Sequence, residues 1–122
     1  GHSFAHGFES VKNFSKKLNH GEAVLLGMMV ASEFANKKKI LPLKDLMLIK
    51  KHYQNLNLPM DLKKIFKKKD IKKIVYFMKK DKKNVDSKIN LILISKIGNV
   101  IKPTNTKFSS KIIEEFLISF YA

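Results

Sequence analysis

One long apolar stretch with a helical start signal most constrains how this chain can fold. Asn19 followed by Glu22 is the pattern of a helix N-cap with its capping-box partner, and it predicts a helix that runs to about Lys38. Apolar side chains would cover nearly all of its circumference, at Val24, Leu25, Leu26, Met28, Met29, Val30 and Phe34. A helix that is apolar all round is buried, so the other elements are expected to surround it. Gly27 in its middle costs about 1 kcal/mol relative to alanine, which predicts the close approach of another backbone.

Shorter helices and one hairpin are predicted for the rest of the chain. The helices are expected at residues 1–11, 42–55, 61–68 and 70–79, with a last one capped by Ser109 or Ser110. In the helix predicted at 42–55, the side that faces the core is expected to carry Leu43, Leu46, Met47 and Tyr53. The hairpin is expected from a strand buried on both faces at 88–97, a turn at Gly98 and Asn99, and a return strand at 100–102, with a loop at 103–108. The fold class predicted is therefore mainly α with one small β-hairpin.

The composition narrows the possible function classes. A chain of 122 residues suits one domain, and the absence of cysteine excludes disulfide frameworks, thiolate zinc sites and iron–sulfur clusters. The net charge of +15 is typical of nucleic-acid-binding proteins, but all 25 basic residues are lysines, whereas base and phosphate recognition favours arginine. We therefore interpret the charge as a solvated lysine surface, without a nucleic-acid partner. The longest apolar stretch is below the roughly 20 residues that span a bilayer, and no signal-peptide pattern opens the chain, so a cytoplasmic protein is expected.

Three of the four histidines lie within the first 20 residues. His2 and His6 are four residues apart and would share a helix face, to which Glu9 is also close. His20 follows at the predicted helix start, and neutral imidazoles are common metal ligands. A catalytic zinc ion usually takes three protein ligands, and no carboxylate is an obvious third. The spacing leaves two interpretations open: a metal site, or a capped helix start with two partly buried histidines.

These histidines belong to a longer pattern. Residues 1–9 read GHSFAHGFE, and residues 20–28 read HGEAVLLGM. They strongly resemble the GHTFGHAIE and HGEAVxxGM motifs of the 3-dehydroquinate synthase family. Further matches follow in the family's order, at Leu58-Pro59, at the DKK of residues 81–83 with Asn84, and at 90–98. The resemblance covers about residues 1–100, and its small departures at Ser3 and Ala5 remove no ligand.

The resemblance implies a multihelical C-terminal domain of the dehydroquinate synthase-like fold, formed by residues 1–122. The family's N-terminal NAD-binding α/β domain would be absent from this chain. The resemblance also implies a zinc or cobalt ion held by His2, His20 and a glutamate upstream of Gly1. His6 would lie near the substrate phosphate, and Lys82 or Lys83 would contact anionic groups of the substrate. Without the motif, the lysine run at 79–83 indicates a solvated turn. Glu22 is interpreted as a helix-capping residue, and His52 as a surface residue.

The reaction that the resemblance implies uses a phosphorylated sugar acid. The full-length lyase, expected to be a homodimer, would convert 3-deoxy-D-arabino-heptulosonate 7-phosphate to 3-dehydroquinate and phosphate with NAD and zinc, in the shikimate pathway of aromatic amino acid biosynthesis. This domain alone is expected to be inactive. One alternative is another sugar phosphate cyclase of the same superfamily. An alternative from a different class is a freestanding helical module that binds polyanions. Iron-dependent alcohol dehydrogenases share the architecture but fit the HGEAV and DKK segments less well.

Overall fold

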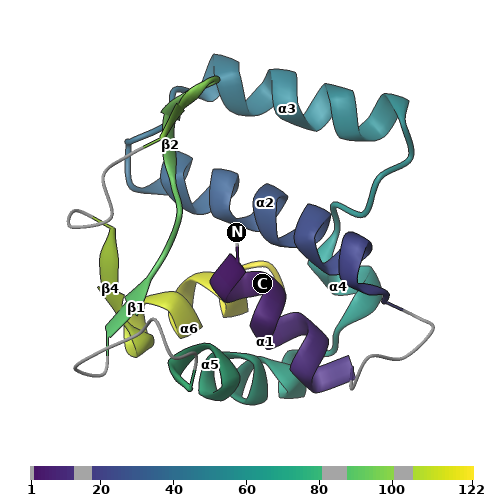
Figure 1. Cartoon of the computed structure of the whole chain (residues 1–122), viewed down its shortest axis with the longest axis vertical. Helices are drawn as coiled ribbons and strands as arrows, with labels where there is room; N and C mark the ends of the chain where they lie inside the picture. The colour runs from purple at the N-terminus through teal and green to yellow at the C-terminus, as the bar shows by residue number, and fades with distance from the viewer. Residues whose placement is uncertain (1, 13–17, 81–87, 101–105) are drawn as a thin grey trace.

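The computed structural model describes residues 2–12, 18–80, 88–100 and 106–122, and of residues 2 and 3 only the backbone. Its helices are α1 (His2–Lys12), α2 (His20–Lys37), α3 (Leu43–Asn55), α4 (Leu62–Ile65), a 3-10 helix (Lys68–Asp70), α5 (Ile71–Lys79) and α6 (Ser110–Ser119). Its strands are β1 (Lys88–Asn90), β2 (Ile94–Lys96), β3 (Asn99–Val100) and β4 (Lys107–Ser109). The prediction of a mainly helical domain with a small hairpin is confirmed (Figure 1).

Helix α2 runs through the middle of the molecule, between α3 on one side and α1, α5 and α6 on the other (Figure 1). Its start is the capping box that the sequence predicts. Asn19 Oδ1 accepts a hydrogen bond from the Glu22 amide at 2.8 Å, and Glu22 Oε1 accepts one from the Asn19 amide at 3.1 Å. Phe34, near the other end of α2, is fully buried and meets the rings of Phe108 and Phe116 edge-on. The helix is therefore fixed at its first turn and anchored in the core near its last.

The prediction that α2 is buried on every side is wrong at Met28. Met29 lies in the core, but Met28 is 51% exposed and borders a hollow of about 470 Å³ between α2, α3 and the β2–β3 hairpin. The inner side predicted for α3 is also wrong in part, because Leu43 and Met47 are exposed. Helix α3 packs through one narrow stripe that includes Leu46 and Tyr53, seven residues apart and both buried.

A side-chain hydrogen bond joins α3 to α2. The Tyr53 hydroxyl donates to the Leu25 carbonyl oxygen at 2.6 Å. Burial of this hydroxyl raises the pKa of Tyr53, since the tyrosinate form would lose hydration. The hydrogen bond therefore links α3 directly to the backbone of α2.

The hairpin forms, but the strand pairing differs from the prediction. Strands β2 and β3 pair antiparallel, with Ile94 opposite Val100. The strand predicted at 88–97 is interrupted at 91–93, and Ile92 is 50% exposed, so it is not buried on both faces. Its first part, β1, pairs instead with β4, whose first two residues fall in the loop predicted at 103–108. The reason is a long-range contact: the Leu91 amide donates to the carbonyl oxygen of the fully buried Thr106 at 2.9 Å. The rest of the predicted return strand and the start of that loop, at 101–105, lie outside the described residues.

Helices α1 and α5 approach each other closely at Gly7, which is buried. A Cβ atom at this position would lie 2.8 Å from the Ile74 carbonyl oxygen. Phe4 and Phe8, on either side of Gly7 along α1, are fully buried, and the Phe8 ring packs on Phe66. Glycine therefore allows α1 to lie against α5. None of the helices in the described ranges combines the length and the apolar composition that spanning a bilayer requires.

Candidate metal centre

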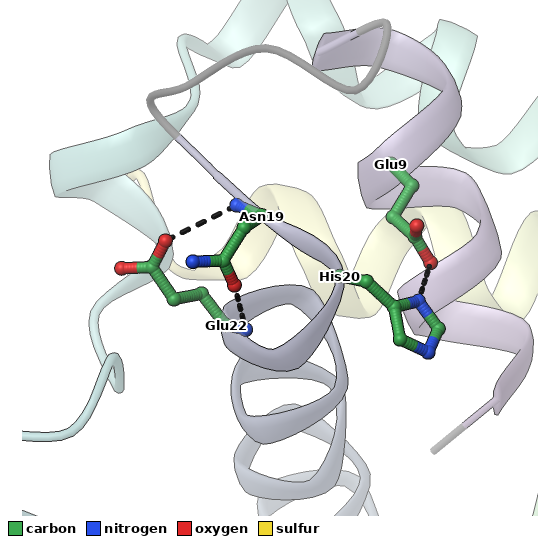
Figure 2. Close-up of polar contacts among 4 residues, drawn as sticks. All are labelled: Glu9, Asn19, His20 and Glu22. Carbon is green, nitrogen blue, oxygen red and sulfur yellow. Dashed lines mark hydrogen bonds and ion pairs between the residues drawn. The ribbon is translucent and has the colours of Figure 1, made fainter.

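The candidate site lies where the C-terminal half of α1 faces the first turn of α2. Oε1 of Glu9 is 2.9 Å from Nδ1 of His20, within hydrogen-bond distance (Figure 2). The two side chains differ sharply in exposure. The Glu9 side chain is 12% exposed, whereas that of His20 is 73% exposed. A buried carboxylate thus supports a histidine that lies at the surface.

The local sequence explains why these two side chains meet. Leu18 is buried just before the Asn19 cap, so the chain enters α2 from a fixed point and His20 is the first helical residue. On α1, Ala5 and Glu9 are four residues apart and both are buried, as expected for neighbours on one helix face. Helices α1 and α2 pack together, so this buried face of α1 brings the Glu9 carboxylate to the start of α2.

The other predicted site residues are only partly described. His6 is exposed on α1, one turn after the backbone of His2. The side chain of His2 lies outside the description, so a metal ion shared by His2 and His20 stays a prediction. Lys82 and Lys83 also lie outside the described residues. In the part of the chain that the structure describes, no three histidine, aspartate or glutamate side chains gather as a complete metal site.

The chemistry of His20 fits a metal ligand. Its Nδ1 faces Glu9, and no described residue forms a hydrogen bond with its Nε2, which belongs to an exposed ring. Metal-binding histidines commonly donate the hydrogen of one ring nitrogen to a carboxylate and bind the ion with the other nitrogen. Sequence reasoning noted that Glu9 is close to the face of His2 and His6, but it missed the contact with His20. The signal was available as the final letter of the GHSFAHGFE motif.

The predictions for Glu22, His52 and the lysine-rich helices are confirmed. Glu22 is the capping-box partner, and His52 is an exposed residue of α3. The lysines of the region from α4 to α5 are exposed, as predicted for a solvated face. Four of them line an open hollow of about 580 Å³ together with Lys12 of α1: Lys63, Lys64, Lys67 and Lys69. Positive charge therefore gathers along this side of the molecule.

Comparison with known proteins decides the family. A family described as 3-dehydroquinate synthase C-terminal matches residues 1–84, more than half of the chain. The chain belongs to the 3-dehydroquinate synthase C-terminal family. The match includes the positions of His2, His6 and His20, and it reaches the DKK of residues 81–83. The resemblance drawn from the two histidine motifs is confirmed.

Curated relatives of this family carry the same name. The chain is 46% identical over 96% of its length to a 3-dehydroquinate synthase of Pelagibacter ubique, and 33% identical over 83% to one of Rhodopseudomonas palustris. It spans only 31% and 28% of the lengths of these relatives. A crystal structure of 2-deoxy-scyllo-inosose synthase complexed with carbaglucose-6-phosphate, NAD+ and Co2+ shares the fold, with a TM-score of 0.71 over 97% of this chain and 33% of that one, at 23% identity.

Proposed function

We propose that this chain is the C-terminal, metal- and substrate-binding part of a 3-dehydroquinate synthase. The whole enzyme would convert 3-deoxy-D-arabino-heptulosonate 7-phosphate to 3-dehydroquinate and phosphate, as a cytoplasmic homodimer of the shikimate pathway. The observation that carries the proposal is the 46% identity to a protein of that name over 96% of this chain. The chain corresponds to about a third of that relative, and in this proposal the NAD-binding domain lies in the remaining part.

Each predicted site residue has a role in this proposal. His2 and His20 hold a zinc or cobalt ion, together with a glutamate from outside this chain. When bound, the ion supplies a Lewis acid for a hydroxyl group of the substrate. The exposed His6 contacts the substrate near its phosphate. Lys82 or Lys83 places a positive charge beside the leaving phosphate, where it stabilises the negative charge that develops.

The alternative within the superfamily is a cyclase for a different sugar phosphate. It is supported by the shared fold with 2-deoxy-scyllo-inosose synthase, but at 23% identity that likeness concerns the fold alone. The relatives with higher identity carry the name 3-dehydroquinate synthase, which favours the first assignment. The inosose synthase was crystallised in complex with NAD+ and Co2+. In our proposal the whole enzyme to which this chain belongs also uses NAD and a divalent metal ion.

A chimera tests the proposal. The C-terminal third of the Pelagibacter relative is replaced by this chain, so that the NAD domain and the upstream glutamate are supplied. We expect the chimera to restore growth without aromatic amino acids to a bacterium that lacks 3-dehydroquinate synthase, and this chain alone not to. His20→Ala should abolish both metal retention and turnover, whereas His6→Ala should lower turnover and retain the metal. His52→Ala, at an exposed position on α3, is the matched control and should change neither.

Two results would contradict the proposal in different ways. A folded chimera that turns over another sugar phosphate, but not the heptulosonate phosphate, would favour the alternative cyclase. Loss of the metal in His6→Ala together with its retention in His2→Ala would show that the two histidines of α1 have been assigned the wrong way round.

A further inference from the structure

Glu9 is the buried carboxylate of the candidate site. Its residue is 9% exposed, and burying a carboxylate is costly unless hydrogen bonds compensate the lost hydration. The partner that the structure gives it is Nδ1 of His20, at 2.9 Å. Glu9 therefore takes its compensation from an imidazole that is itself 73% exposed.

The choice of partner is specific, because lysines are abundant in this chain. It contains 25 of them, and Glu33 on α2 does pair with one, Lys50, at 2.6 Å. Glu22, two residues after His20, uses its carboxylate in the capping box. Of these three carboxylates, only Glu9 faces a histidine. If the contact served only to give the buried carboxylate of Glu9 a hydrogen-bond donor, a lysine would serve equally well.

In a neutral imidazole, the contact with Glu9 selects one tautomer of the His20 ring. A neutral imidazole has one N–H donor and one lone-pair acceptor. Because a carboxylate only accepts, Nδ1 must be the protonated nitrogen, and the lone pair is then on Nε2. The hydrogen bond also limits rotation of the ring, so Nε2 keeps one direction. Nδ1 and Nε2 lie on different sides of the ring, so a carboxylate at Nδ1 is held away from an ion at Nε2 (Figure 2).

We propose that Glu9 is a positioning residue, which holds His20 as the Nδ1–H tautomer and so presents Nε2 to a divalent metal ion. It is not itself a ligand of that ion. This inference rests on the proposed function, which makes His20 a metal ligand.

The tautomer can be measured without metal. Nitrogen-15 NMR of the chain, at about pH 8.5 where imidazoles are ordinarily neutral, distinguishes the two forms of His20. We expect the Nδ1–H form in the wild type. Glu9→Met fills a similar space without an acceptor and should shift His20 towards the Nε2–H form, which unpaired imidazoles favour in water. Glu9→Gln keeps an acceptor oxygen and should retain much of the wild-type form. Glu33→Met, the matched control, removes a carboxylate of α2 that pairs with Lys50, and it should leave the tautomer of His20 unchanged.

A Co2+ titration of the chimera tests the link to the metal. Glu9→Met should lower the Co2+ affinity by about 10- to 100-fold, with Glu9→Gln in between, while the control Glu33→Met should stay within about twofold of the wild type. At saturating Co2+ the visible absorption spectrum of Glu9→Met should match that of the wild type, because the ligands are the same. Unchanged affinity in Glu9→Met would overturn the inference.

Three further outcomes separate the possibilities. A changed Co2+ spectrum at saturation would show that Glu9 is a ligand, which overturns the inference. An Nε2–H form in the wild type would also overturn it, whether or not any variant folds. The wild-type chimera could bind no Co2+ while the tautomer of His20 still changed in the Glu9 variants. The metal assignment of the proposed function would then fail, and the positioning of His20 by Glu9 would stand.

Discussion

Replacing Gly7 by alanine tests the close approach of α1 to α5. A Cβ atom at this position would lie 2.8 Å from the Ile74 carbonyl oxygen and 2.9 Å from Cγ of Met78. The methionine side chain can rotate away, but the carbonyl oxygen belongs to the backbone of α5. The two helices would therefore have to move apart, in a region where Phe4 and Phe8 are fully buried.

Two opposing effects determine the size of the change. Alanine in place of glycine inside a helix stabilises it by about 1 kcal/mol. Overfilling a packed core costs about 1–3 kcal/mol, and a backbone contact belongs at the upper end of that range. We expect Gly7→Ala to lower the free energy of unfolding by about 2 kcal/mol, measured by urea denaturation and followed by circular dichroism.

Gly21→Ala is the matched control in α2. A Cβ atom there would meet only Asn19 Oδ1, at 3.5 Å, which is an ordinary contact. Its free energy of unfolding should stay the same or rise by up to about 1 kcal/mol. Equal stability of Gly7→Ala and Gly21→Ala would refute the reasoning, because the helical preference would then act without any steric cost at Gly7.

Two further predictions concern a half-buried tyrosine and a buried aspartate. Burial, with nearby aspartates, raises the pKa of Tyr121 to about 12, so the stability that this group contributes is complete below about pH 10 and is lost as the pH rises towards 12. The Tyr121 hydroxyl donates to the Phe66 carbonyl oxygen, so the variant Tyr121→Phe should be about 1 kcal/mol less stable than the wild type at pH 8. The variant should lose less stability than the wild type between pH 10 and 12. Equal losses in the free energy of unfolding, measured by urea denaturation at each pH, would contradict this. Asp45, buried on α3, accepts a hydrogen bond from the Ile97 amide at 3.2 Å. Asp45→Ala should speed hydrogen exchange at that amide by about fivefold, since the hairpin loses a contact of about 1 kcal/mol, and an unchanged rate would count against the contact.

The features that the sequence predicts well are local ones. The capping box joins Asn19 and Glu22, three residues apart, and its residue types specify the hydrogen bonds directly. The inner side of α3 was predicted only in part, because residue types alone do not tell how broad a stripe a neighbouring helix covers. Leu43 and Met47 are as apolar as Leu46, yet they are exposed.

The features that sequence reasoning missed depend on contacts between distant residues. Strand β4 forms because its residues pair with β1, and Lys88 lies opposite Ser109. The Glu9–His20 contact joins two helices whose packing no local pattern specifies. The family motif identified His20 as a candidate ligand, but only the structure shows which carboxylate faces it.

The capping box and the burial of α2 have a consequence for the thermodynamics of metal binding. Because the helix start is formed by its own side chains, the backbone of His20 is ordered by folding and not by a ligand. The conformational entropy of this residue is therefore lost before any ion arrives, unlike in zinc fingers, which fold only when metal is added. Binding at this histidine would leave the far-ultraviolet circular dichroism of the domain almost unchanged.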